Sequence, residues 1–89
     1  MKQTEYKTLF VDRMTPCPKD GTLYMLPQFN VAIHNCMCGC GKQVVTPLGD
    51  GQWSWSFDGD STTLSPSVGN FQYDCKSHYF LRQGKVTWV

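Results

Sequence analysis

The sequence predicts an all-β protein, folded as a small antiparallel sandwich or partial barrel. Short segments rich in β-branched and aromatic residues recur along the chain. Glycine, proline and aspartate turn signals separate these segments. No segment shows apolar residues at helical spacing over three turns. Because the chain has only 89 residues, we expect one domain over residues 1–89.

The expected strands of the first half all end near a turn signal. Residues 6–11 (YKTLFV) are β-prone and lead into the turn-rich segment 15–21 (TPCPKDG). Residues 22–26 (TLYML) form the next expected strand, which a proline closes, and residues 29–34 (FNVAIH) follow it. Residues 42–46 (KQVVT) form another, again ended by a proline, since proline cannot donate a hydrogen bond within a sheet.

The second half contains the clearest strand signal of the chain. Residues 52–57 (QWSWSF) alternate strictly, with both tryptophans and the phenylalanine on one face, which indicates a half-buried strand. Residues 61–64 (STTL) are a short expected strand. Residues 79–81 and 85–89 flank a Gln-Gly pair and are expected to form a terminal hairpin. We expect most aromatic side chains to fill the core of so small a sheet protein.

Ligand-type residues concentrate in two short clusters. Cys36, Cys38 and Cys40 stand within five residues (CMCGC), and Cys75 and His78 form the second group (CKSH). Two groups of soft donors, far apart in sequence, are typical of a zinc site. A chain this short also benefits from a metal staple, because its core alone is small. We therefore expect the β domain to be stapled by one Zn²⁺ site, with buried thiols and a core histidine as the alternative.

The spacing leaves open which four of the five candidates bind the ion. Glycines after Cys38 and Cys40 favour that pair, because glycine allows the turns that aim two thiols at one ion. In an extended chain Cys36 would share their face, and Cys75 would complete a four-cysteine set without His78. An iron–sulfur centre is a further alternative, but the first cluster lacks the Cys-x-His pair of a Rieske loop.

Composition argues against several classes of partner. The net charge is +1 and charged residues are sparse, which disfavours nucleic acid and anionic membranes as partners. No apolar run approaches the roughly 20 residues that span a bilayer, and the N-terminal residues lack a signal-peptide pattern. We expect a cytoplasmic protein, whose reduced cysteines bind metal rather than form disulfides.

Serines near the second cluster raise the possibility of an enzyme. Ser67 is the candidate nucleophile, with His34 or His78 as its base. The alternative is that Ser65 and Ser67 only cap a turn around Pro66. Three carboxylates could orient a base: those of Asp58, Asp60 and Asp74.

The combination of motifs resembles a small bacterial and phage family known as a domain of unknown function. The shared features are HxCxCGCG, SPS, CxSHYF and GxVxW, over roughly residues 32–89, and Met37 stands where a proline is expected. Some members of that family are encoded beside bacterial ubiquitin-like modifiers and their activating and conjugating enzymes. The resemblance implies metal binding by the matched cysteines, a catalytic role for Ser67 and a histidine, and a peptidase that processes or removes the modifier.

These observations lead to one assignment and one alternative. Ser67 and His34 are assigned to catalysis. The metal is assigned to Cys36, Cys38, Cys40, Cys75 and His78. The first hypothesis is a peptidase or deconjugase that acts on a ubiquitin-like modifier. The alternative is a non-catalytic, zinc-stabilised module that binds a protein partner, since no complete catalytic constellation is visible in the sequence.

Overall fold

The computed structural model describes residues 2–14 and 17–89, so part of the expected turn at 15–21 lies outside the described residues. The described residues form β-strands and one short 3₁₀ helix, η1 (Pro27–Phe29), which confirms the all-β prediction. The strands are β1 (Lys7–Phe10), β2 (Thr22–Leu26), β3 (Val31–Asn35), β4 (Gln43–Pro47), β5 (Ser54–Phe57), β6 (Thr62–Ser65), β7 (Val68–Gly69), β8 (His78–Arg82) and β9 (Lys85–Trp88). No helix in these two ranges is long and apolar enough to cross a membrane.

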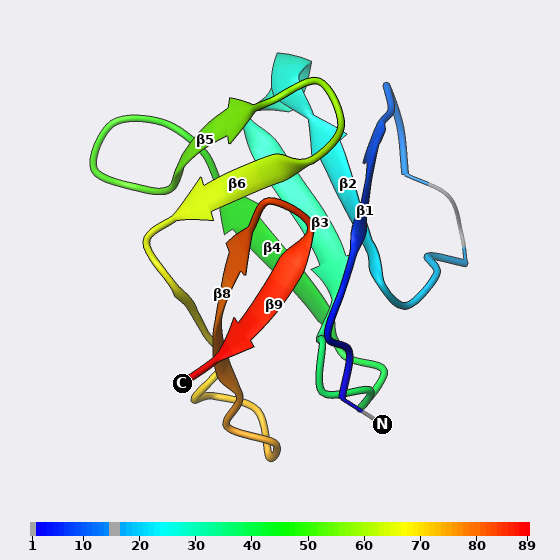
Figure 1. Cartoon of the computed structure of the whole chain (residues 1–89), viewed down its shortest axis with the longest axis vertical. Coiled ribbons are helices and arrows are strands. Elements are labelled where there is room, and N and C mark those ends of the chain that lie inside the picture. Colours follow the sequence, from blue (N-terminus) through cyan, green and yellow to red (C-terminus); the bar gives the residue numbers. More distant parts are fainter. Residues whose placement is uncertain (1, 15–16) are drawn as a thin grey trace.

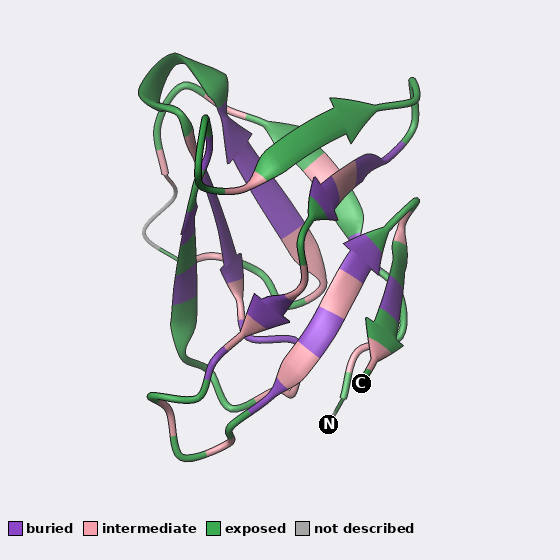
Figure 2. Cartoon of the chain, turned by 90° about the vertical axis from the view of Figure 1, so that its left-hand side faces the viewer, coloured by how far each residue is buried: buried purple, intermediate pink, exposed green. Residues whose placement is uncertain are grey.

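The strands form three small sheets in the order β1-β2-β3-β4, β5-β6 and β7-β8-β9, and not a closed barrel among the described residues. Figures 1 and 2 show the four-stranded and three-stranded sheets as two layers, with β5 and β6 crossing at one end. One pairing differs from the antiparallel prediction: β1 and β2 run parallel. The long connection between these two strands carries the chain back to its starting side, as a parallel pair requires.

The main core lies between these two layers. Leu23 and Met25 of β2 pack there with Tyr79 and Leu81 of β8. The alternate side chains of β2 face the other way and form a smaller cluster with Ile33. Because successive side chains of a strand point to opposite faces, β2 is buried on both sides.

Strand β5 corrects one expectation. Trp55 and Phe57 share a face, as the alternation predicts, but they are 39% and 45% exposed and do not join the core. Figure 2 shows the strand in the colour of exposed residues. The ring of Phe10 from β1 packs against both, at centroid distances of 6.0 Å and 5.0 Å. Only Trp53, just before the strand, packs against the main core. The alternation correctly predicted which side chains of the strand share a face. That face is covered by the single ring of Phe10 and not by the core.

Candidate functional site

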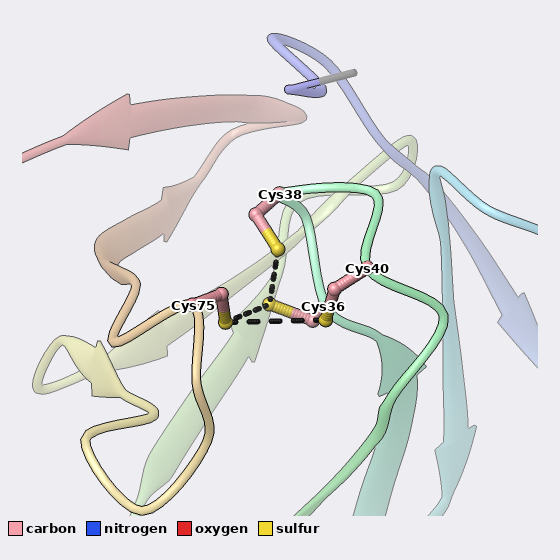
Figure 3. A group of neighbouring side chains, drawn as sticks. All are labelled: Cys36, Cys38, Cys40 and Cys75. Atoms are coloured by element: carbon pink, nitrogen blue, oxygen red, sulfur yellow. Dashed lines mark hydrogen bonds between the residues drawn. The ribbon is translucent and has the colours of Figure 1, made fainter.

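Four cysteine side chains converge from two loops (Figure 3). Cys36, Cys38 and Cys40 lie on the loop between β3 and β4, and Cys75 lies on the loop between β7 and β8. All four sulfur atoms lie within 4.8 Å of one another. The sulfur of Cys36 is 3.4 Å from that of Cys38 and 3.7 Å from that of Cys75, and Cys40 is 3.9 Å from Cys75. Four thiols this close could hold one metal ion.

Local backbone geometry explains how three cysteines reach one point from one loop. The N–H of Cys36 donates to the carbonyl of Lys42, and the N–H of Gly39 donates to the carbonyl of Cys36. These bonds close a tight loop. Gly39 and Gly41 have φ values of 88° and 84°, a region that residues with a Cβ rarely occupy. The two glycines therefore turn the chain between successive thiols.

The surroundings of Cys38 and Cys75 shift the pKa values of these two thiols in opposite directions. Burial raises the pKa of Cys38 to about 12. Hydrogen bonds from the side chain and then the backbone of Ser77 lower the pKa of Cys75 to about 6. Because the thiolate is the metal-binding form, Cys75 is the sulfur of this pair that is ready to bind a cation near neutral pH.

The fifth candidate ligand, His78, lies elsewhere. Its Nε2 atom is 2.7 Å from the Oγ of Ser67, and the group of four candidate ligands does not include it. The structure thus brings the four cysteines together and pairs His78 with the candidate nucleophile. This differs from the assignment of His78 to the metal and matches the four-cysteine alternative.

His34 also takes a different place from the one assigned to it. Its ring is fully buried, and its Nε2 atom lies 2.7 Å from the hydroxyl of Tyr79. Burial lowers the pKa of His34 to about 4, so the ring is neutral near pH 7. The side chain points from β3 into the core toward β8, where it binds Tyr79 and not Ser67.

Strand register brings Ser67 and His78 together. Ser67 precedes β7, and His78 begins β8. Gly69 lies opposite His78, and Ser67 stands two residues before Gly69, on the same side of the extended chain. Both Ser67 and His78 are partly exposed. A hydroxyl within hydrogen-bond reach of an imidazole is the arrangement of a nucleophile and its general base.

Aromatic rings, and not a carboxylate, surround the imidazole. The ring centroids of Phe71 and Phe80 lie 5.4 Å and 6.4 Å from that of His78. The carboxylate of Asp58 instead accepts hydrogen bonds from the N–H groups of Asp60 and Ser61, which lower its pKa. In residues 2–14 and 17–89, no hydrogen bond or ion pair joins a carboxylate to His78.

A buried polar network surrounds the cysteines and includes Ser77, the residue before His78, and the sequence did not reveal it. The hydroxyl of Ser77 lies 3.0 Å from the sulfur of Cys36, and the Nδ2 of Asn70 donates to that hydroxyl at 2.9 Å. Asn70 also donates to the hydroxyl of Tyr79 at 3.3 Å. Both polar residues flank the Cys75 loop. Their position beside Cys75 was the only signal in the sequence that could have pointed to the network. Because buried polar groups need hydrogen-bond partners, each of these side chains bonds to another member of the network.

The fold and site together define a small all-β protein that carries a four-cysteine cluster beside a serine–histidine pair. Residues 10–89 match the family model described as "Bacterial ubiquitination-like system serine protease (BubE)". The match covers most of the chain, so the chain belongs to this family. This agrees with the resemblance to a family encoded beside ubiquitin-like conjugation genes. No curated protein and no solved structure matches the chain.

Proposed function

We propose that this chain is a zinc-stapled serine peptidase that processes or removes a ubiquitin-like modifier, with Ser67 as nucleophile and His78 as general base. The carrying observation is the 2.7 Å contact between the Oγ of Ser67 and the Nε2 of His78 on a partly exposed surface. The family description, which names a serine protease of a ubiquitination-like system, supports the reaction class and the kind of partner.

The proposed reaction is acyl transfer in two steps. The Oγ of Ser67 attacks the scissile carbonyl carbon while the Nε2 of His78 takes the hydroxyl proton. The tetrahedral intermediate collapses, the C–N bond breaks, and His78 gives its proton to the leaving amine. His78 then takes a proton from a water molecule as it attacks the ester carbonyl; the bond between the acyl carbon and the Oγ of Ser67 breaks, the acid leaves, and His78 returns the proton to Oγ.

His78 would be oriented by packing, because it lacks a carboxylate partner among the described residues. Phe71 and Phe80 flank its ring. Its backbone carbonyl accepts a hydrogen bond from the N–H of Val89, which fixes the start of β8. Such a pair would work as a dyad, in which neighbouring side chains hold the base in place of a third polar group.

The proposed metal is a structural zinc ion held by the four cysteines. Zinc–sulfur bonds of about 2.3 Å give a tetrahedron with edges of about 3.8 Å. The sulfur–sulfur distances of 3.4, 3.7 and 3.9 Å are close to that edge. A closed set of four thiolates supplies a staple between two loops and leaves the hydrolytic chemistry to Ser67 and His78. A reducing cytoplasm would keep the thiols available for the ion.

The test is cleavage of the ubiquitin-like modifier of the same system, extended at its C-terminus by a reporter protein. Wild-type protein should release the reporter, and Ser67→Ala should not, although its melting temperature should stay the same. Ser65→Ala is the matched control, because Ser65 is an exposed serine two residues away. Undiminished cleavage by Ser67→Ala would contradict the proposal.

One observation favours a second candidate function, a zinc-stabilised module that binds a protein without cleaving it. His78 has no carboxylate partner in the described part of the chain. A module of this kind would hold its partner equally well after Ser67→Ala and release it when the metal is removed. A wild-type chain that binds the extended modifier and leaves it intact would favour this function.

A further inference from the structure

A groove separates two free sheet edges beside Ser67. Strand β4 is an outer strand of the four-stranded sheet, and β7 is an outer strand of the three-stranded sheet. A groove of about 260 Å³ lies between them, lined by residues 43–46 of one edge and 68–70 of the other. A larger hollow of about 1080 Å³ lies along the N-terminal segment. Ser67 and His78 line neither hollow, but residues 68–70 of the smaller one directly follow Ser67 in the chain.

The register of β7 directs the backbone of Gly69 into this groove. The N–H of Asn70 donates to the carbonyl of Ser77, so these two residues form a hydrogen-bonded pair. Hydrogen-bonded and non-hydrogen-bonded pairs alternate along an antiparallel ladder. Gly69 and His78 are the next pair and are therefore not bonded to each other. The N–H and C=O of Gly69 point away from β8, toward the open edge.

The same argument applies to Val45 on the opposite wall. The N–H of Cys36 donates to the carbonyl of Lys42, which identifies a hydrogen-bonded pair of the β3–β4 ladder. Counting along the ladder from that pair, Val45 and Ile33 form a non-hydrogen-bonded pair. The N–H and C=O of Val45 therefore also point away from their own sheet.

Side-chain and backbone donors satisfy outward carbonyl groups at the two ends of the groove. The hydroxyl of Tyr73 donates to the carbonyl of Gln43 at 2.6 Å. The backbone N–H of Trp53 donates to the carbonyl of Pro47, and its indole N–H donates to that of Ser67 at 3.3 Å. Between these ends, within residues 17–89, Val45 and Gly69 have no partner for their outward groups.

We propose that an extended substrate segment binds in this groove as an added strand, hydrogen-bonded to Gly69 on one side and to Val45 on the other. This inference rests on the proposed function. The two unpaired edge residues offer one donor and one acceptor each, which is the complement of an extended peptide backbone. Gly69 stands two residues after Ser67, so a strand paired with Gly69 lies next to the segment that carries the nucleophile.

The size of the groove indicates which segment fits. Its volume is below the range of about 300–1,000 Å³ typical of drug-sized ligands. It therefore suits a short stretch of backbone with small side chains, such as an unstructured C-terminal tail. Recognition through backbone groups would depend on extended conformation more than on side-chain identity.

The test uses a tetrapeptide library in which each peptide ends in an aminocoumarin amide. The best-cleaved peptide is then N-methylated at one residue at a time. We expect wild type to cleave members of the library, and removal of a single paired N–H to lower kcat/KM by about 2- to 10-fold. Wild type that cleaves no member, or cleavage that no N-methylation slows, would overturn the proposal.

A chain variant tests the same contact from the protein side. Val45→Pro removes the outward N–H, and proline is tolerated there because that N–H does not bond β3. The comparison variant is Val45→Thr, which alters the side chain and keeps the N–H. We expect kcat/KM of Val45→Pro to fall about 2- to 10-fold below that of Val45→Thr. Equal values for the two variants would overturn the proposal.

A small fluorophosphonate probe distinguishes failure of the groove proposal from failure of the proposed peptidase function. It reacts with an activated serine and needs no extended segment. Val45→Pro should show the lower kcat/KM for peptide cleavage but keep the labelling rate of Val45→Thr. A parallel loss of labelling would overturn the groove proposal, because the substitution would then act through the serine–histidine pair. Failure of the wild type to label at Ser67 would instead contradict the proposed function.

Discussion

The hydroxyl of Ser77 lies 3.0 Å from the sulfur of Cys36, and the next residue in the chain is His78. The same hydroxyl lies 3.6 Å from the sulfur of Cys75 and accepts a hydrogen bond from Asn70. The cysteine cluster and the serine–histidine pair therefore share one short segment. A change at the cluster should alter where β8 begins and where the imidazole lies.

Loss of one of the proposed metal ligands should destabilise the whole domain. Cys75→Ser should unfold the protein or lower its melting temperature strongly, since a structural zinc ion supplies apparent binding energy of about 10 kcal/mol or more. Cys17→Ser is the control, because Cys17 is exposed and lies outside the cluster. Thermal melting with and without a chelator measures the effect. A melting curve that Cys75→Ser leaves unchanged would refute the structural-metal account.

Removing the hydroxyl of Ser77 should cost stability even with the metal bound. Ser77→Ala leaves the buried amide of Asn70 without one partner, which costs about 1–3 kcal/mol. Urea unfolding of the metal-loaded protein measures this loss. Ser56→Ala, an exposed serine on β5, should change the free energy of unfolding by about 0.5 kcal/mol or less. Equal effects of the two substitutions would argue against the network.

The two histidines should respond in opposite ways to glutamine substitution. His78→Gln should abolish fluorophosphonate labelling and leave the melting temperature nearly unchanged, because His78 is partly exposed. His34→Gln should lower the melting temperature, because it disturbs the buried contact with Tyr79, and labelling per folded molecule should remain. The reverse pattern would restore His34 as the catalytic base.

Alkaline pH should destabilise the fold through Tyr6. Burial raises the pKa of Tyr6 to about 12, and its hydroxyl donates to the carbonyl of Thr62. The unfolded chain loses this proton near its ordinary pKa of about 10, while the folded chain keeps it. Stability is therefore complete below about pH 10 and falls as the pH rises toward 12, by at most about 1.4 kcal/mol per pH unit.

Tyr6→Phe should remove that contribution. The free energy of unfolding, measured in urea between pH 9 and pH 11, should fall less steeply with pH in the variant than in the wild type. An identical pH dependence in both proteins would show that Tyr6 does not titrate as its burial requires. Tyr79 contributes a slope of the same sign in both proteins, because burial also raises its pKa.

Much of the fold could be predicted because its signals are local. Alternation and turn residues located most strands, and the spacing of Cys36, Cys38 and Cys40 located the first half of the cluster. Strand β7 was missed, since two residues carry no periodicity. The parallel pairing of β1 and β2 depends on the path of the chain between them, which no local pattern encodes.

The roles of the two histidines could not be read from spacing. His34 alternates with the cysteines, and His78 stands at a typical ligand distance from Cys75. Their partners depend on contacts between distant segments: β3 packs against Tyr79, and β7 sets Gly69 opposite His78. The exposure of Trp55 also depends on contacts with distant segments, because alternation predicts which side chains share a face but not what packs against that face.

The central claim is that Ser67 is an activated nucleophile paired with His78. Its most direct test is mass spectrometry of the metal-loaded protein after incubation with a fluorophosphonate, followed by peptide mapping. The account predicts a single adduct on Ser67 in the wild type and none in Ser67→Ala or His78→Gln. A folded wild-type protein that forms no adduct, or a Ser67→Ala variant that forms the same one, would contradict it.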